Sequence, residues 1–287
     1  MFASNVAIRL VMVLVGVFAL AGSALGEPVA LVTDLSGSGS HDGNDLEILV
    51  ELEAGNKVTL ADGSVLSVVF YANGDEYNFS GPAAFEVGQS GPGDLSGAEP
   101  VSRQSAPKGF GAVSTIGLAQ AAMVMRGNSN EARLTLVFPA ETTLLSAPDE
   151  FRWHALDSGV GYSFELTDFE GRSMIETTVN GTSLEVPEQL KLVPGGYYTW
   201  SIETRLPDGQ KYSNWANFSV ADSELLASVA ENRPDDEDNV SSMVQFALWL
   251  EENELIDESQ KYWFKINELR PGVKSVQARL GLTVQVE

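Results

Sequence analysis

The sequence predicts a mainly β, multidomain fold that ends in a C-terminal α-helical hairpin. Three observations lead to this prediction. Short apolar segments with period-two alternation fill most of the chain up to residue 222. Asn-Gly and Asp-Gly pairs, which supply the positive φ of tight hairpins, separate several of these segments. After Val220 the apolar period changes to about 3.6 residues, which is the period of an amphipathic helix.

Residues 1–26 are expected to be a secretory signal peptide. Arg9 is the only charged side chain before Glu27, and an apolar run from Leu10 to Ala21 follows it. Small residues then precede Glu27, as at a cleavage site. The run is short for a bilayer span, which needs about 20 apolar residues. We therefore expect an exported chain, periplasmic or secreted, with no membrane span after cleavage; an uncleaved anchor is the alternative.

Composition excludes several classes of chemistry and partner. The chain has no cysteine, which excludes disulfides, thiol catalysis and cysteine-based metal sites. It carries 40 Asp and Glu against 17 Lys and Arg, for a net charge of −23. Phosphate backbones and anionic lipid surfaces require clustered cations, so nucleic acid and anionic membranes are excluded as partners. Basic protein surfaces and divalent cations remain as possible partners.

Residues 27–87 are predicted to form a small all-β domain, a sandwich or β-roll. Turn signals recur about every ten residues, at Asp62-Gly63, Asn73-Gly74 and Gly81-Pro82. The pattern "LEAGNKVTLADGSVLSVVFYANGDEYNFSGPAAFEV" resembles a FecR-type domain. FecR proteins proper are membrane sensors with a cytoplasmic segment before the span. Only a few residues precede the apolar run in this chain, so the resemblance implies the periplasmic module alone.

Residues 88–130 are predicted to be a linker. The stretch "GQSGPGDLSGAEPVSRQSAPKGFG" is rich in Gly, Ser and Pro, a composition typical of a mobile linker or a long loop. The apolar segment "GLAQAAMVMRG" within the same region is expected to form a short strand that docks on one of the β-domains.

Residues 131–222 are predicted to form a β-sandwich. Aromatic residues alternate in "FRWHAL", "GYSFEL", "YYTWSIET" and "NWANFSV", and we expect the core to include Phe151, Trp153, Tyr162, Phe164, Tyr198, Trp200, Trp215 and Phe218. A Pro-Gly-Gly turn precedes Tyr198. These motifs resemble a fibronectin type III or related Ig-like repeat. The resemblance implies a spacer or binding module, and no catalytic activity.

Residues 223–287 are predicted to form a short helix that is broken at Pro234, then a helical hairpin, and then the start of a further helix. One stripe carries Val240, Met243, Val244, Ala247 and Leu250. The hairpin is similar to one tetratricopeptide unit, with Trp263 on its large aromatic position, Ser259 on its small position and Pro271 on its terminal proline. One such unit rarely stands alone, so we expect it to pack on the sandwich domain or on a partner.

The function expected from these features is non-enzymatic binding or assembly with another envelope protein. The expected contact surface is the tail around Trp249, Tyr262 and Trp263. Trp249 lies off the main apolar stripe, so we expect it to be exposed, as suits an interface. Packing of Trp249 on the sandwich domain is the alternative.

A carbohydrate-binding module of the cell envelope is the alternative function, with a polysaccharide as the partner. Its candidate surface residues are Tyr197 and Tyr212, since Tyr197 alternates out of phase with Tyr198 and should face outward. A third hypothesis is a hydrolase that uses His41 with Asp42 or Asp45.

No catalytic residue, cofactor or metal is expected. The sequence has neither a Gly-x-Ser-x-Gly elbow nor a phosphate-binding Gly-rich loop. The acidic segments at 42–47 and 235–238 lack the spacing of a helix-loop-helix calcium site. We interpret the first as a solvated loop and the second as a helix start, and weak cation binding is the alternative for each. His154 is expected to be an exposed strand residue.

Overall fold

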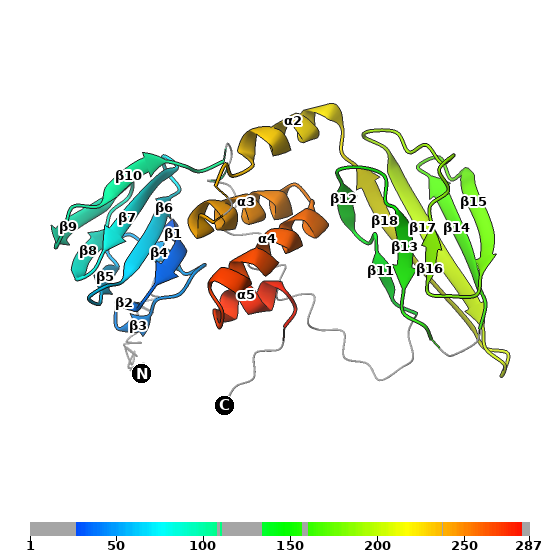
Figure 1. The fold of residues 1–287 in the computed structure, drawn as a ribbon, viewed down its shortest axis with the longest axis horizontal. Helices are drawn as coiled ribbons and strands as arrows, with labels where there is room; N and C mark the ends of the chain where they lie inside the picture. The colour runs from blue at the N-terminus through cyan, green and yellow to red at the C-terminus, as the bar shows by residue number, and fades with distance from the viewer. Residues whose placement is uncertain (1–26, 108–109, 111–133, 157–159, 237, 283–287) are drawn as a thin grey trace, which may run out of the picture.

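The computed structural model of the protein describes residues 27–107, 110, 134–156, 160–236 and 238–282. Within these residues the fold is mainly β, with four sheets and a C-terminal helical region, so the predicted fold class is confirmed. Two β-sandwiches lie at opposite ends of the molecule, and the C-terminal helices lie between them (Figure 1). The expected signal peptide lies outside the described residues.

The first sandwich consists of ten strands in two antiparallel sheets. The strands are β1 (Pro28–Ser36), β2 (Gly39–His41), β3 (Asn44–Asp45), β4 (Glu51–Glu53), β5 (Lys57–Leu60), β6 (Val65–Phe70), β7 (Asp75–Ser80), β8 (Ala83–Val87), β9 (Pro92–Ser96) and β10 (Val101–Gln104). One sheet has the order β10-β7-β6-β1-β4 and the other β3-β2-β5-β8-β9. Their shared core includes Phe79 and Phe85, whose rings stack with centroids 4.0 Å apart.

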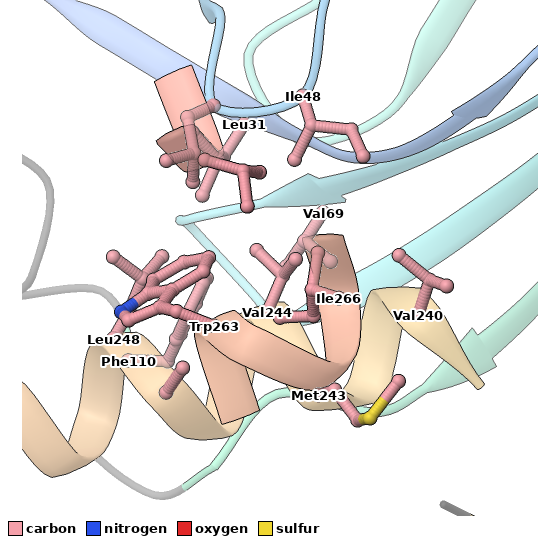
Figure 2. Close-up of a cluster of buried hydrophobic side chains, with 13 residues drawn as sticks. Leu31, Ile48, Val69, Phe110, Val240, Met243, Val244, Leu248, Trp263 and Ile266 are labelled. Carbon is pink, nitrogen blue, oxygen red and sulfur yellow. The ribbon is translucent and has the colours of Figure 1, made fainter. Parts of the chain in front are cut away.

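The sheet that contains β1 and β6 is buried on both faces. Every residue of β6 after the first is buried. Val68 and Phe70 belong to the core between the sheets, whereas Val69 belongs to a second core against the helices. In β1, Val32 belongs to the core between the sheets and Leu31 belongs to the core against the helices. The first sandwich and the helices therefore form three layers, and Figure 2 shows the core between sheet and helices.

The segment predicted as a linker contributes two strands to the first sandwich. β9 pairs with β8, and β10 pairs with β7. Phe110 is buried against the helices, with its ring centroid 6.2 Å from that of Tyr71. The linker interpretation is wrong for residues 92–104. An edge strand needs few apolar side chains, and every side chain of β10 is exposed. The apolar segment "GLAQAAMVMRG" lies outside the described residues.

The second sandwich pairs a three-stranded sheet with a five-stranded one. Its strands are β11 (Leu136–Phe138), β12 (Thr142–Leu144), β13 (Glu150–Trp153), β14 (Tyr162–Asp168), β15 (Ser173–Val179), β16 (Ser183–Glu185), β17 (Tyr197–Arg205) and β18 (Lys211–Val220). The sheet orders are β11-β13-β16 and β12-β18-β17-β14-β15. Seven of the eight expected core aromatic residues are buried, and the exception is Trp215.

The Pro-Gly-Gly turn before β17 is explained by the tyrosine that follows it. Gly195 has a φ of +75°, which favours glycine. A Cβ atom on Gly196 would lie 2.4 Å from the hydroxyl oxygen of Tyr198. That hydroxyl accepts a hydrogen bond from the backbone N–H of Val193 at 2.8 Å. The two glycines thus let the buried ring of Tyr198 pack against the turn and close it.

The helical region contains α2 (Ser223–Asn232), α3 (Val240–Glu252), α4 (Ile256–Leu269) and α5 (Lys274–Arg279). Asp222 caps α2 by accepting a hydrogen bond from the N–H of Leu225 at 2.8 Å. Asn239 caps α3 through the N–H of Ser242 at 2.9 Å. Caps of this type begin helices because they satisfy free N–H groups of the first turn.

The hairpin of α3 and α4 packs mainly on the first sandwich. Its apolar face covers β1 and β6, where Met243 and Val244 of α3 and Ile266 of α4 join the second core. The turn between the two helices also contacts β12, since the N–H of Thr143 donates to the carbonyl of Glu254 at 2.7 Å. The sequence predicted packing on the second sandwich or on a partner, and it missed this main contact.

Candidate binding surface

The predicted partner surface in the tail is largely buried. Trp249 is 5% exposed and Trp263 is fully buried. Trp249 stacks on Phe246 with ring centroids 5.8 Å apart. The partly buried Tyr262 contacts the ring of Phe246 edge-on, with centroids 5.0 Å apart. The prediction of an exposed Trp249 is wrong, because α3 is enclosed by the sheet on one side and by α2 and α4 on the other. A helix that is apolar all round is a buried helix.

Trp263 belongs to a buried polar cluster that joins three helices. Its indole N–H donates to Glu251 at 2.7 Å. Arg279 of α5 forms an ion pair with Glu251, and its guanidinium lies 5.7 Å from the centroid of the Trp263 ring. Burial raises the pKa of Glu251, and the charge of Arg279 opposes that rise. These contacts give Trp263 a structural role.

A polar seam joins α3 to the first sandwich. The buried carboxylate of Glu76 on β7 accepts hydrogen bonds from the side chains of Arg103 (3.1 Å), Ser105 (2.7 Å) and Gln245 (3.1 Å). Nearby, the hydroxyl oxygens of Thr33 and Ser241 lie 2.6 Å apart. Burial alone would raise the pKa of Glu76, but hydrogen bonds led by that of Ser105 hold it below its usual value.

An ion pair holds the far end of α4. Arg270 donates from Nε and Nη2 to the two carboxylate oxygens of Asp34, both at 2.8 Å. Burial raises the pKa of Asp34, and the hydrogen bonds from Arg270 oppose the rise. The hydroxyl of Ser275 donates to the carbonyl of Ile48 at 2.6 Å. The inner side of the helical region is therefore a cover for the first sandwich.

The outer face of the five-stranded sheet of the second sandwich is open. Along β17, buried residues alternate with more exposed ones, and the prediction that Tyr197 faces outward is confirmed at 48% exposure. Trp215 on β18 is 61% exposed. The expectation that Trp215 lies in the core is wrong. Ala216 and Phe218 occupy the inward positions, and Trp215 has the opposite parity.

We call this surface the Trp215 face. It consists of the outward residues Ser163, Glu165 and Thr167 of β14, Glu176 and Thr178 of β15, Tyr197, Thr199, Ser201, Glu203 and Arg205 of β17, and Lys211, Ser213, Trp215, Asn217 and Ser219 of β18. Hydroxyl, amide and carboxylate groups surround its two aromatic rings. Alternation along β18 could have identified Trp215, because Trp215 and Phe218 cannot both face inward on one regular strand.

The two tyrosines proposed for a glycan surface do not lie on the same face. Tyr212 has the parity of the buried Ala216 and Phe218 and is partly buried. Its hydroxyl donates to Gln210 at 2.5 Å. Tyr197 remains on the Trp215 face, whereas Tyr212 lies at the opposite face of β18, so the pair does not form a single platform.

The residues proposed for a hydrolase are not arranged as a catalytic set. The carboxylate of Asp42 accepts hydrogen bonds from the side chain of Asn56 (2.7 Å) and the N–H of Lys57 (3.0 Å). The Nδ1 atom of His41 is buried and has no hydrogen-bond partner among the described residues. Nδ1 of His41 therefore forms no hydrogen bond to either aspartate. His154 is exposed, as predicted, but it follows the end of β13 and is not a strand residue.

No cofactor or metal site is apparent in the part of the chain that the structure describes. It contains no group of three or more His, Asp or Glu side chains with the geometry to hold a metal ion. Open clefts of about 680, 430 and 420 Å³ occur there, and none of the three has a histidine in its lining. The smallest lies between the second sandwich and α4, with Phe138, Arg152 and Asp257 among its walls.

Comparison with known proteins gives no family for this chain. No family model and no curated protein matches it. Among solved structures it is similar to CopC from Methylosinus trichosporium OB3b, with 19% identity and a TM-score of 0.26, over 32% of this chain and 96% of that chain. Similarity at this level supports no conclusion about fold or function. None of the described helices has the length and apolar character that a bilayer crossing requires.

Proposed function

We propose that this chain is a non-enzymatic exported protein that binds another envelope protein through the Trp215 face. The observation that carries the proposal is the exposure of Trp215. Its side chain is 61% exposed in the interior of β18, while the other four tryptophans of the chain are at most 5% exposed. Exposed aromatic residues with polar neighbours are enriched where proteins bind one another.

The arrangement of the two sandwiches supports this location. The helices cover the outer face of the first sandwich at β1 and β6, where Trp263 is buried, and Trp249 is buried in a separate core among α2, α3 and α4. The covered sheet face and the buried tryptophans are therefore not available to a partner. The Trp215 face keeps its aromatic rings exposed on a regular sheet, which needs little rearrangement to bind.

Export to the periplasm is part of the proposal. It is supported by the signal-like residues 1–26 and by the resemblance of the segments to FecR-type, fibronectin-like and tetratricopeptide-like modules. The mass of the protein purified from the periplasmic fraction tests it, with a chain that begins at Glu27 as the expected result. A full-length chain in the membrane fraction would contradict it.

Glycan binding is a second candidate because of the groups around Trp215. Thr199, Ser201 and Asn217 occupy neighbouring outward positions on β17 and β18. An indole face beside hydroxyl and amide groups can stack on a sugar ring and bind its hydroxyls. This candidate uses the same surface, and it predicts retention by an immobilised envelope polysaccharide.

Affinity capture after mild crosslinking tests the protein-binding proposal. The exported chain, its Trp215→Ser variant and a Phe264→Ser variant are compared on the same envelope extract. Phe264 is the matched control, since it is an exposed aromatic residue (57%) on α4 and lies outside the Trp215 face. We expect Trp215→Ser to lose specific partners that the other two proteins keep.

Two results would contradict the proposal. Loss of capture in Phe264→Ser alone would place the interface on the exposed side of the helical tail. The second result is that no protein is captured, while a polysaccharide column retains the exported chain and Phe264→Ser but not Trp215→Ser. This result would favour glycan binding.

A further inference from the structure

One row of residues crosses the Trp215 face from the edge strand β15 to β18. In the register of the sheet, Glu176 on β15 lies opposite Glu165 on β14, Glu165 lies opposite Ser201 on β17, and Ser201 lies opposite Trp215 on β18. Both glutamates are exposed. Since neighbouring strands are about 4.8 Å apart, Glu165 and Trp215 are separated by about 10 Å across the sheet.

The charges of this row are not neutralised within the described structure. Glu165 and Glu176 are directly opposed like charges, an arrangement that destabilises a sheet. Neither forms an ion pair with a described residue, whereas Glu203 in the next row is paired with Lys211 at 2.6 Å. The sheet therefore presents two carboxylates without a counter-charge beside an exposed indole.

The same sign of charge recurs at the other end of the face. Loss of solvation raises the pKa of Tyr197, and the charges of Glu141 and Glu254 raise it further. Glu141 also accepts a hydrogen bond from the N–H of Asn217 at 3.1 Å. Each exposed aromatic ring of the Trp215 face thus has carboxylates near it, so a basic ligand would meet favourable charge at both rings. The cations Arg205 and Lys211 lie at the end of the face next to the β17–β18 turn.

We infer that the Trp215 face binds a basic segment of its partner, with one Arg or Lys side chain over the indole of Trp215 and a second between Glu165 and Glu176. This inference rests on the proposed function and adds the chemistry of the partner. An indole face attracts a guanidinium or ammonium group through its ring quadrupole. The two carboxylates supply the counter-charge, and Arg can bind a carboxylate with two hydrogen bonds.

A defined peptide tests this inference without an unknown partner. The probe is a labelled twelve-residue Gly/Ser peptide with four arginines, and its control has citrulline in place of each arginine. Binding is followed by fluorescence anisotropy at low and at physiological salt. We expect saturable binding of the arginine peptide, weaker at the higher salt, and no binding of the citrulline peptide.

Variants then locate the peptide on the sheet. We expect the double variant Glu165→Gln, Glu176→Gln to weaken binding by roughly threefold to tenfold, and Trp215→Ser to weaken it by a similar factor. Phe264→Ser should leave affinity unchanged. Trp215 is the one exposed tryptophan of the five. Acrylamide quenching of tryptophan fluorescence should therefore fall when the arginine peptide binds.

The outcomes separate this inference from the proposed function. Equal binding of the two peptides, or unchanged affinity in the glutamine variant, would overturn the inference. If the arginine peptide does not bind and Trp215→Ser still abolishes envelope capture, the proposed function stands and the basic partner is wrong. If the peptide binds as expected and capture does not depend on Trp215, the proposed function is wrong.

Discussion

The outer face of a five-stranded sheet is covered by helices in the first sandwich and exposed in the second. In the first sandwich, β6 is buried at every residue after its first, because α3 and α4 cover the face that the other sheet does not. In the second sandwich, β17 alternates between buried and more exposed residues. The comparison shows that a β-domain with a helical cover has lost one surface for binding, whereas an uncovered one has kept it.

The covered face is also held by specific polar contacts. Glu76 binds Arg103 of the neighbouring strand β10 and Gln245 of α3, and Asp34 binds Arg270 at the end of α4. On the Trp215 face, the carboxylates of Glu165 and Glu176 have no such partners among the described residues. Buried carboxylates on the first sheet therefore stabilise the fold, and exposed ones on the second are available to a ligand.

The largest expected effect is the loss of the helical cover. Trp263→Ala removes a fully buried indole and leaves Glu251 without one of its donors. We expect the first sandwich and the helices to lose about 3–5 kcal/mol of unfolding free energy. Urea unfolding of the full exported chain measures this change. A loss below about 1 kcal/mol would mean that the helices do not stabilise the first sandwich.

The next effect comes from the polar seam. Glu76→Gln places an amide nitrogen among side chains that donate to the carboxylate, so we expect a loss of about 1.5–3 kcal/mol at neutral pH. The folded pKa of Glu76 lies below 4.5, so its contribution is present above pH 4.5 and is lost as the pH falls through the folded pKa. Unfolding curves at pH 7 and below pH 4 should therefore differ less for Glu76→Gln than for the unchanged protein. An equal difference would show that Glu76 is not the group responsible.

A smaller effect of opposite sign is expected on the open face. Glu165→Gln removes the like-charge pair with Glu176 and should raise the unfolding free energy by roughly 0.2–1 kcal/mol. Urea unfolding at low salt measures the gain, which should shrink at high salt. A loss of stability would show that Glu165 has a favourable interaction in the fold, and it would remove the basis for a cation at this position.

The smallest effect on stability is expected at Trp215 itself. Because its side chain is 61% exposed, Trp215→Ser should change the unfolding free energy by at most about 0.5 kcal/mol. Thermal unfolding compared with the unchanged protein checks this value. A large loss would indicate that the indole packs within the fold, and its exposure could not then be assigned to binding.

Local patterns in the sequence were enough to predict the fold class and much of the second sandwich. Alternation identified the core around Trp200, and the Pro-Gly-Gly motif identified the turn at Gly195 and Gly196. Alternation also assigns Trp215 to the face opposite Phe218, so the prediction that Trp215 lies in the core conflicts with the period of its own strand. The prediction from the sequence also missed β9 and β10, because edge strands with polar side chains look like a linker.

The helical cover could not be predicted, because it depends on contacts between distant parts of the chain. Gln245 binds Glu76 across 169 positions, and Arg270 binds Asp34 across 236. No local periodicity reports which sheet a helix will cover. The consequence is practical. A chain truncated at Val220 would expose Leu31 and Val69 of the first sandwich, so loss of binding after truncation would not identify an interface in the tail.

Site-specific photo-crosslinking tests the central claim most directly, because it leaves both sandwiches intact. A photoreactive amino acid is placed at Ser213, two residues from Trp215 on the same face, and separately at Phe264 on α4. Our account predicts crosslinked partner protein from position 213 and none from position 264 in envelope extracts. Crosslinks from position 264 alone would contradict it and place the binding surface on the helices.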